Sequence, residues 1–423
     1  MKISLFPSHL YGTVTAPPSK SVGHRSIICA ALSGSRVIVR NCGESDDMTA
    51  TTACVEALGS AVVRNGKTLV ISPAKKGVKD IVLDCRESGS TARFMIPVAA
   101  ALGVENAEFK GSGRLPERPF GIIAEALRKN GVACSSDKLP LTVSGRLKSG
   151  VFEIPGNVSS QYISGLLLAL SVTEGESRIV LTSKLESAAY VDITLNELSA
   201  FGADIEKTEN IYKINGKPSL SATERTVEGD WSQAAFFLCA GAVSDGITVS
   251  GVDAESLQGD REIIDLLRSF GATVTVDGDS VAGSRGELSG IEIDASQIPD
   301  LVPILAVLAA AIPGRTVIGN AGRLRLKESD RLCSVHAMLT ALGGRVTMDD
   351  ESLTVDGTGR LIGGAGDACN DHRIAMAAAV AACLCDEPVV INGAEAVRKS
   401  YPSFFKEFSE RGMSVCPLYS GEN

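Results

Sequence analysis

Residues 370–384 read NDHRIAMAAAVAACL, a polar turn that leads directly into a long apolar run. The same arrangement occurs six times in the 423 residues. The six turns are marked by Ser21, Ser90, Ser160, Ser232, Asp300 and Asp371. Successive markers are 68 to 72 residues apart, and a period this regular indicates an internal repeat. Each repeat is therefore expected to begin a helix at the same point, and the N-terminus of a helix attracts anions.

A second marker, a glycine at the end of an amphipathic segment, repeats with the same period. The glycines are Gly59, Gly131, Gly202, Gly271, Gly343 and Gly412. Segments such as LSAFGADI (198–205) and LLRSFGATV (266–274) predict an amphipathic helix that ends at the glycine and is followed by a strand. Each repeat should then contain a buried helix, a strand, an amphipathic helix and further strands, in an α/β fold.

The length of the chain indicates two domains, because 423 residues exceed what a single core normally serves. Six repeats divide into three plus three, with the boundary near residues 226–229. Residues 1–17 precede the first repeat as a short strand (KISLF) and a turn, and the pattern alone does not decide where they pack. If they pair with the second half, the chain crosses twice, near 17–20 and 226–229, which makes a hinge with the ligand between the halves.

Composition excludes several classes of function. A net charge of −9 argues against a nucleic-acid surface, although a cleft in an acidic protein can still hold small anions. The eleven cysteines form no CxxC pair, and Cys29, Cys239, Cys383 and Cys385 lie inside apolar runs. We interpret these four as small core residues in a reducing cytosol, and expect neither a disulfide framework nor a zinc site. The longest apolar run, 301–312, contains Pro303 and is too short to span a bilayer. The N-terminus resembles neither a signal nor a transit peptide.

Cations stand at two of the helix starts, where the helix dipole disfavours them. Lys20 follows Pro17, Pro18 and the predicted N-cap Ser19, with Arg25 further along the same helix. Arg373 lies in the first turn of a helix too apolar to be exposed, and His372 precedes it. A bound anion would resolve the conflict at both places. The alternative for Lys20 is an ordinary surface lysine, and His372 is equally consistent with a structural role.

Other polar residues are candidates for the same anion site. Lys327 and Arg331 are four residues apart, which predicts one shared helical face with Glu328 on another side, although most such charged runs are solvated surfaces. The remaining candidates are Ser159, Ser160, Gln161, Ser88, Gly89, Ser90, Arg93, Arg118, Tyr190 and Lys399, and for any one serine plain N-capping is the simpler explanation. If these openings converge, the site holds several negative charges, and Asp300 and Glu328 remain for proton transfer.

Taken together, the segments resemble the 5-enolpyruvylshikimate-3-phosphate (EPSP) synthase family, the 3-phosphoshikimate 1-carboxyvinyltransferases. The matching segments cover the whole chain and include PPSKSVGHRS, GSTARF, LPERPFG, VSSQY, SAAYVDITL, LRLKESDRL, NDHRIAMA and KSYPSFF. The resemblance implies an inside-out α/β barrel of six βαβαββ-type units. Residues 18–227 would form one domain, residues 1–17 with 228–423 the other, and the active site would lie in the cleft between them.

The resemblance also implies a reaction and its site. The enolpyruvyl group of phosphoenolpyruvate would pass to the 5-hydroxyl of shikimate 3-phosphate through a tetrahedral intermediate, without metal or cofactor, in the shikimate pathway to aromatic amino acids. By position, the residues for shikimate 3-phosphate are Lys20, Ser21, Arg25, Ser159, Ser160, Gln161, Ser187, Tyr190, Asp300 and Lys327. Those for phosphoenolpyruvate are Lys20, Gly89, Arg118, Gln161, Arg331, Arg373 and Lys399. Asp300 resembles the base and Glu328 the proton donor, helped by Lys399 or Lys327, although the assignment of acid and base stays open.

The chain departs from the family pattern at three places. Glu87 stands in the turn before Gly89, where a carboxylate near a phosphate is unfavourable, so it must point away, pair with an arginine or be protonated. Phe94 and Arg323 also differ from the residues of many relatives. Gly89 leaves room for glyphosate, so we expect sensitivity to that inhibitor. We expect a cytoplasmic monomer that binds neither nucleic acid nor membrane.

Two rival functions remain. The UDP-N-acetylglucosamine enolpyruvyl transferases share the fold and the donor but carry a reactive loop cysteine, for which Cys85 is the nearest and a poorly matching candidate. A non-catalytic anion-binding relative is the other rival, and the presence of Asp300, Glu328, Lys20 and Lys399 argues against it.

Overall fold

The computed structural model describes residues 1–418, which form two compact units. The first unit comprises Pro18–Glu228, and the second comprises Met1–Pro17 with the described residues from Gly229 onward. Each unit contains three four-stranded sheets, which gives six in all. The α/β class and the six repeats are thus confirmed. The six sheets are separate and open, and no closed ring of strands occurs among the described residues.

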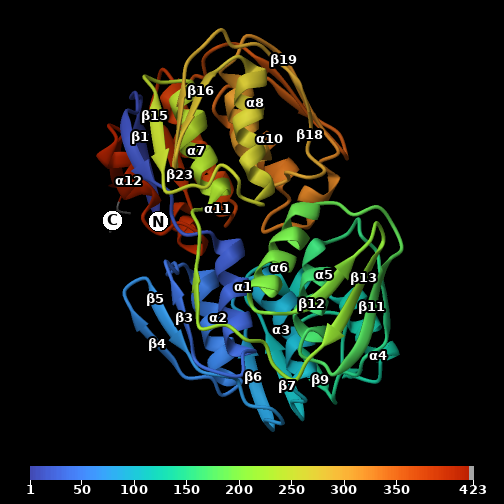
Figure 1. Cartoon of the computed structure of the whole chain (residues 1–423). Helices are drawn as coiled ribbons and strands as arrows, with labels where there is room; N and C mark the ends of the chain where they lie inside the picture. The colour runs from blue at the N-terminus through green and yellow to red at the C-terminus, as the bar shows by residue number, and fades with distance from the viewer. Residues whose placement is uncertain (419–423) are drawn as a thin grey trace, which may run out of the picture. The chain divides into compact units, whose positions relative to one another are not determined.

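The first unit follows the expected repeat three times (Figure 1). Its elements are α1 (Lys20–Ala31), β3 (Val37–Arg40), α2 (Asp46–Ala57), β4 (Val62–Asn65), β5 (Thr68–Ile71), β6 (Asp80–Asp84), α3 (Gly89–Ala101), β7 (Asn106–Lys110), η1 (Leu115–Glu117), α4 (Gly121–Lys129), β8 (Ala133–Cys134), β9 (Leu141–Ser144), β10 (Val151–Ile154), α5 (Ser160–Leu170), β11 (Gly175–Leu181), α6 (Ala188–Ala200), β12 (Asp204–Lys207), β13 (Ile211–Gly216) and β14 (Glu224–Thr226). The sheet orders are β14-β3-β5-β4, β6-β7-β9-β8 and β10-β11-β13-β12.

The second unit repeats the same plan. Its elements are β1 (Lys2–Phe6), β2 (Gly12–Thr15), α7 (Trp231–Ala242), β15 (Ile247–Ser250), η2 (Gly259–Glu262), α8 (Ile263–Phe270), β16 (Thr273–Asp277), β17 (Ser280–Ser284), β18 (Glu292–Asp294), α9 (Val302–Ala310), β19 (Gly314–Gly319), η3 (Gly322–Leu326), α10 (Arg331–Ala341), β20 (Val346–Met348), β21 (Leu353–Gly357), β22 (Gly364–Asp367), α11 (His372–Ala381), η4 (Ala382–Leu384), β23 (Val389–Asn392), η5 (Ala394–Lys399), α12 (Phe404–Glu410) and β24 (Ser414–Leu418). The sheet orders are β16-β17-β15-β2, β18-β19-β21-β20 and β22-β23-β1-β24.

All six sheets have the same pairing pattern. One edge strand lies parallel to its neighbour, and two antiparallel pairings complete the sheet, as in β6-β7-β9-β8. A parallel pair needs a crossover connection, and in four of the sheets this crossover is a buried helix, as α3 is between β6 and β7. In the other two sheets the parallel partners, β14 beside β3 and β2 beside β15, are far apart in the chain, and α1 and α7 each join strands of two different sheets. The N-terminus of every buried helix nevertheless follows an edge strand.

Residues 1–17 supply two strands to the second unit. β2 lies parallel to β15, and β1 is inserted between β23 and β24, with Ile3 opposite both Ile391 and Pro417. In Figure 1 the blue β1 accordingly lies beside the red C-terminal elements of that unit. The chain thus leaves the second unit after residue 17 and returns to it at residue 229.

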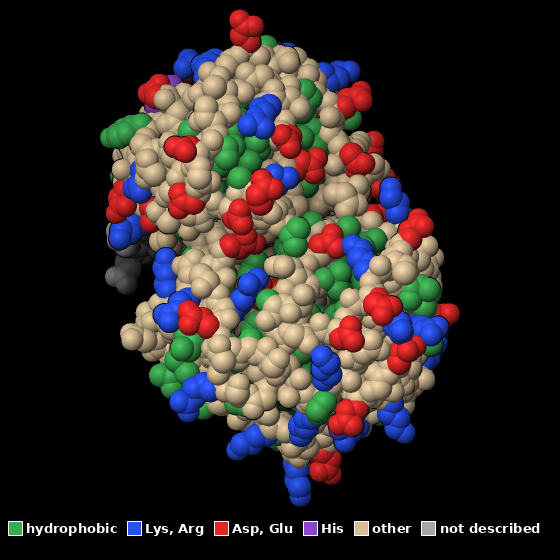
Figure 2. Space-filling model, viewed as in Figure 1, with side chains coloured by type: hydrophobic (Ala, Val, Ile, Leu, Met, Phe, Trp, Pro, Cys, Tyr) green, Lys and Arg blue, Asp and Glu red, His purple; other side chains and the backbone are tan. Residues whose placement is uncertain are grey.

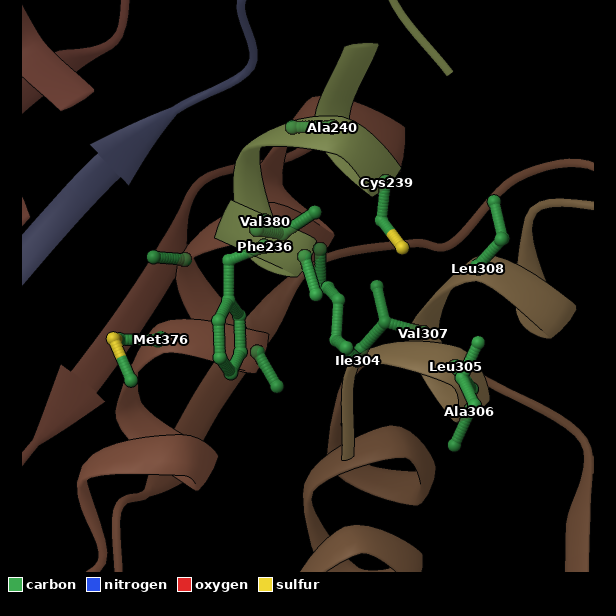
Figure 3. Packing of buried hydrophobic residues seen from close by; sticks show 14 of the residues in the cluster. Phe236, Cys239, Ala240, Ile304, Leu305, Ala306, Val307, Leu308, Met376 and Val380 are labelled. Carbon is green, nitrogen blue, oxygen red and sulfur yellow. The ribbon is translucent and has the colours of Figure 1, made fainter. Parts of the chain in front are cut away.

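The core of the second unit is formed by α7, α9 and α11, which contact one another, while the sheets lie outside them. Their apolar side chains interlock, and Phe236 and Cys239 of α7 pack close to Ile304 of α9 and Val380 of α11 (Figure 3). Burying one such side chain contributes about 1.5–3 kcal/mol. Because helices that are apolar on every side need protein all round them, this arrangement fixes where their polar first turns emerge.

The glycine marker behaves as predicted. All six glycines have φ between 75° and 106°, a left-handed conformation that favours glycine after the last turn of a helix. No described helix is long and apolar enough to cross a membrane. On the face seen in Figure 2, basic and acidic side chains are interspersed, so no single sign of charge dominates it.

Candidate active site

The first polar turn positions Lys20 at the start of α1. Ser19 caps the helix by accepting a hydrogen bond from the Val22 amide, as predicted. The Lys20 ammonium donates to Asp47 Oδ2 at 2.7 Å, from the first turn of α2. The carboxylate of Asp47 therefore already offsets the repulsion between Lys20 and the helix dipole. This repulsion does not by itself indicate a bound anion.

Arg25 lies one turn further along α1 and is 2% exposed. Its guanidinium donates to Thr194 Oγ1 (2.6 Å), to Ser164 Oγ (3.2 Å) and to the carbonyl oxygens of Ser21 and Tyr190. These acceptors are all neutral, and burial lowers the pKa of Arg25 to about 10. Arg25 thereby ties α1 to α5 and α6 and fixes the backbone of Tyr190.

The start of α3 meets two arginines. Ser88 caps this helix, and a Cβ placed on Gly89 would come within 2.6 Å of Arg118 Nη1 and 2.7 Å of Arg93 Nη1. The guanidinium of Arg93 also donates to Gln161 Oε1 at 2.8 Å, and Gln161 Nε2 donates to Ser90 Oγ at 2.8 Å. The second and third polar turns are thus joined at this point.

The serines predicted to contact shikimate 3-phosphate in this unit include three at the N-termini of α5 and α6. Ser159 caps α5 and Ser160 is its first residue, buried beside Gln161. Ser187 precedes α6 with φ 54° and ψ 45°, a left-handed conformation that costs a non-glycine residue about 1–2 kcal/mol. Strain of this kind is found at functional positions more often than elsewhere. Tyr190 lies in the first turn of α6 and is half-buried.

In the second unit, three cations converge on Asp300. Its Oδ1 accepts from Lys327 Nζ at 3.2 Å and from Arg331 Nη1 at 2.7 Å, while Oδ2 accepts from Arg373 Nη2 at 2.9 Å. Burial alone would raise the pKa of Asp300, but Arg373, Lys327 and Arg331 together hold it well below its usual range. Asp300 does not cap α9, whose N-cap is Leu301, so its carboxylate is turned to the cations.

Arg331 is the centre of the charge cluster and is only 1% exposed. It donates from Nε to Asp371 Oδ2 at 2.8 Å and from Nη2 to Glu328 Oε2 at 2.6 Å, in addition to its bond with Asp300. Although burial lowers the pKa of this guanidinium, Asp371, Glu328 and Asp300 raise it well above the usual value. The cluster therefore keeps Asp300 and Arg331 ionised inside the protein.

Arg373 joins the three polar turns of the second unit. Besides Asp300, it contacts Ser232 Oγ at 3.0 Å in the first turn of α7. Lys399, at the end of η5, donates to the Asn370 carbonyl just before α11. Within this unit, the polar turns that carry Asp300, Arg373 and Lys399 therefore lie together.

One local prediction was wrong. Lys327 and Arg331 do not share a helical face, because η3 ends at Leu326 and α10 begins only at Arg331. Glu328 does not face away either, since it pairs with Arg331. The cap at Asp330, which accepts from the Cys333 amide, starts α10 one turn later than the charge spacing suggested. Lys327 and Arg331 nevertheless meet through Asp300.

Several supporting residues were missed by the sequence analysis. Asp371, which is fully buried, accepts from Arg331 and from the Arg373 amide, yet we used it only as a repeat marker. Asp47 and Thr194 were not considered at all. The signal for Asp371 was present in the sequence, as an acidic N-cap two residues before Arg373, a cation in the first turn of a buried helix.

Glu87, which departs from the family pattern, and Cys85, the candidate for the rival transferase, both have definite surroundings. Glu87 is half-buried, and its carboxylate lies against Gly113, where an added Cβ would meet Oε2 at 2.5 Å. Cys85 is fully buried, and its hydrogen bond with Cys54 together with burial raises the pKa of its thiol. A buried protonated thiol is not a reactive loop nucleophile. Within residues 1–418, no group of three or more His, Cys, Asp and Glu side chains could hold a metal ion.

Comparison with known proteins agrees with this geometry. The sequence profile described as EPSP synthase (3-phosphoshikimate 1-carboxyvinyltransferase) matches residues 6–408. The chain belongs to the EPSP synthase family. It is 43% identical to the 3-phosphoshikimate 1-carboxyvinyltransferase of Clostridium acetobutylicum, with 99% of each chain covered, and 42% identical to that of Clostridium kluyveri, with 98% of each covered.

Solved structures show the same architecture. An EPSP synthase from Acinetobacter baumannii superposes with a TM-score of 0.81 at 26% identity, covering 98% of this chain and all of that one. The enolpyruvyl transferase NikO from Streptomyces tendae gives a TM-score of 0.79 at 19% identity, with 99% of each covered, which is a likeness of fold alone.

Proposed function

We propose that this chain transfers the enolpyruvyl group of phosphoenolpyruvate to the 5-hydroxyl of shikimate 3-phosphate and releases phosphate. The step would be an addition followed by an elimination, through a tetrahedral intermediate, in the shikimate pathway to aromatic amino acids. The observation that carries the proposal is the cluster of Lys327, Arg331 and Arg373 around Asp300, in a chain of this family. Such a cluster offers cations for a polyanion and a carboxylate for proton transfer.

The first unit would bind shikimate 3-phosphate. Its proposed contacts are Lys20, Ser21, Arg25, Ser159, Ser160, Gln161, Ser187 and Tyr190, completed by Asp300 and Lys327 of the second unit. The neutral hydrogen-bonding partners of Arg25 support this assignment, because a buried cation without a carboxylate partner attracts an anion. The proposal therefore requires groups of both units in one turnover.

Phosphoenolpyruvate would be bound by cations from both units. The proposed contacts are Lys20, Gly89, Arg118, Gln161, Arg331, Arg373 and Lys399. A bound phosphate or carboxylate would take over part of the charge of Arg331 and Arg373, which now holds the pKa of Asp300 down. Asp300 would then become a better base for the 5-hydroxyl, while Glu328 would donate a proton to the methylene carbon, helped by Lys399 or Lys327.

The decisive experiment measures phosphate release from phosphoenolpyruvate in the presence and absence of shikimate 3-phosphate. The proposal requires release that depends on this acceptor. Release with UDP-N-acetylglucosamine instead would support the rival transferase, against which the burial of Cys85 already argues. Binding of both ligands without release would identify a non-catalytic relative.

Inhibition by glyphosate is a second test of the donor site. Because Gly89 has no side chain between α3 and Arg118, we expect micromolar glyphosate to compete with phosphoenolpyruvate in steady-state kinetics. Failure of such competition would contradict the assignment. The eleven free cysteines support a reducing compartment, and we propose that the enzyme works in the cytoplasm.

A further inference from the structure

A chain of hydrogen bonds crosses the interior of the first unit behind Lys20 and Gly89. His24 Nδ1 lies 2.6 Å from Thr51 Oγ1, which lies 2.6 Å from Thr91 Oγ1. The Thr91 hydroxyl donates to Ser88 Oγ at 2.7 Å. All four side chains are at most 1% exposed. The chain thus links α1, α2 and α3 out of reach of solvent.

The direction of this chain follows from its last bond. Because the Thr91 hydroxyl gives its proton to Ser88, it must accept from Thr51, which in turn must accept from His24 Nδ1. The ring therefore carries its proton on Nδ1. Its Nε2 has no hydrogen-bonding partner among the described residues, which costs less for a bare nitrogen than for an unsatisfied N–H. Burial, Lys20 and Arg25 all lower the pKa of His24, so the ring stays neutral.

The two ends of this hydrogen-bonded chain, His24 and Ser88, lie next to Lys20 and Gly89, which are proposed contacts of phosphoenolpyruvate. His24 and Lys20 are four residues apart on α1, and their partners Thr51 and Asp47 are four apart on α2. Equal spacing places both pairs along one helix–helix contact. At the other end, Ser88 caps α3 and so fixes the position of the backbone at Gly89.

We propose that His24 is a positioning residue for the donor site, acting through Thr51, Thr91 and Ser88 to hold the start of α3 in register with the start of α1. This proposal rests on the function proposed above. None of the four side chains is assigned a contact with substrate. Their effect is on the placement of Lys20 relative to Gly89, and hence on the binding of phosphoenolpyruvate.

Paired threonine variants on α2 test the proposal. Thr51→Val removes a hydroxyl from the chain at nearly constant volume, whereas Thr52→Val removes one that bonds only to the Met48 carbonyl of the same helix. We expect Thr51→Val, and likewise Thr91→Val, to raise the KM for phosphoenolpyruvate roughly three- to tenfold, the equivalent of one lost buried hydrogen bond, with a smaller change in kcat. Thr52→Val should leave the KM unchanged. Equal KM values in Thr51→Val and Thr52→Val would overturn the proposal.

Substitutions of His24 separate its hydrogen bond from its bulk. The amide nitrogen of His24→Asn can replace Nδ1–H, so this variant should keep a KM near that of the wild type, whereas His24→Leu should raise it as Thr51→Val does. The double variant His24→Leu/Thr51→Val should be no worse than either single variant, because both break one chain. Full additivity, or an Asn variant as impaired as the Leu variant, would refute the role.

A spectroscopic measurement tests the direction of the chain without any assay of activity. Nitrogen-15 NMR of the four histidines should show one neutral ring protonated on Nδ1, lost in His24→Asn. A ring protonated on Nε2 would reverse the chain and overturn the proposal. If the wild type releases no phosphate, the proposed function fails. The NMR measurement still determines the direction of the hydrogen bonds from His24 to Ser88.

Discussion

Arg25 in the first unit and Arg331 in the second are both buried guanidinium groups, yet their partners differ in kind. Arg25 donates only to hydroxyl and carbonyl oxygens, and burial lowers its pKa to about 10. Arg331 donates to the carboxylates of Asp300, Glu328 and Asp371, which raise its pKa. One arginine is left with charge that a ligand can neutralise, and the other is neutralised by the protein.

The contrast separates two ways of preparing for an anion. Around Arg25, no carboxylate is hydrogen-bonded to the guanidinium and competes with an approaching phosphate. In the second unit, by contrast, a ligand must compete with Asp300 and Glu328 for Arg331 and Arg373. Such competition frees carboxylates at the moment when substrate binds, which suits groups that must exchange protons.

The largest expected effect is on turnover, and it should come from removing the proposed proton donor of the second unit, Glu328. Glu328→Gln keeps the shape of the side chain but cannot give up a proton, so we expect kcat to fall by about 10²–10⁴. Binding of shikimate 3-phosphate, measured by calorimetry, should be largely unchanged. Glu410→Gln, at the exposed end of α12, is the matched control. Unchanged turnover in Glu328→Gln would remove this residue from the mechanism.

Removing the buried support of Arg331 should mainly affect stability. In Asp371→Asn the side chain can still cap α11, so the change reports on the ion pair with Arg331. Losing one partner of such a pair costs about 3–5 kcal/mol, which should appear as a marked fall in Tm. Asp356→Asn, which breaks the exposed pair with Arg315, should barely shift Tm. Equal shifts in the two variants would show that Arg331 does not depend on Asp371.

The first unit, where the buried Arg25 has neutral partners, can be tested by adding a methyl group at the start of α3. Gly89→Ala places a Cβ within 2.6–2.7 Å of Arg118 and Arg93, so both side chains must move. We expect the KM for phosphoenolpyruvate to rise by about tenfold, which corresponds to ~1.4 kcal/mol of binding energy. Tm should not fall, because alanine favours a helix more than glycine does. An unchanged KM would place the donor elsewhere.

The smallest expected effect is the dependence of stability on pH that the buried His24 causes. His24 is neutral in the folded state with a lowered pKa, whereas the unfolded chain titrates near the ordinary value of about 6.5. As the pH falls below about 6.5, the unfolded state gains a proton that the folded state does not, so stability is full above this pH and declines below it by up to about 1.4 kcal/mol per unit. Tm should therefore fall less between pH 7 and pH 5.5 in His24→Asn than in the wild type. Parallel curves would contradict the buried neutral ring.

The repeat and its helix starts could be predicted from sequence because they depend on neighbours in the chain. Ser19, Asp230 and Asp371 each cap the helix that follows them, and a cap needs only a few consecutive residues. The sequence analysis failed where a contact joins different repeats. Asp371 to Arg331 and Thr194 to Arg25 span 40 and 169 positions, and no local period contains them.

The charge run around Lys327 was misread for a related reason. Spacing alone suggested a helix, but the carboxylate of Asp330 offered the Cys333 amide a stronger local start for α10. Lys327 was left outside the helix, free of the four-residue periodicity, and its ammonium reached Asp300 instead. A pattern of charges predicts a shared helical face only when the start of the helix is known.

The insertion of β1 between β23 and β24 has a consequence during synthesis on the ribosome. The first unit closes its last sheet with β14, at residues 224–226, so its strands are complete when little more than half of the chain has been made. The second unit places β1 between β23 and β24, which lie almost four hundred residues later in the chain. The nascent β1 must therefore wait, unpaired, until these two strands have been translated before its sheet can form.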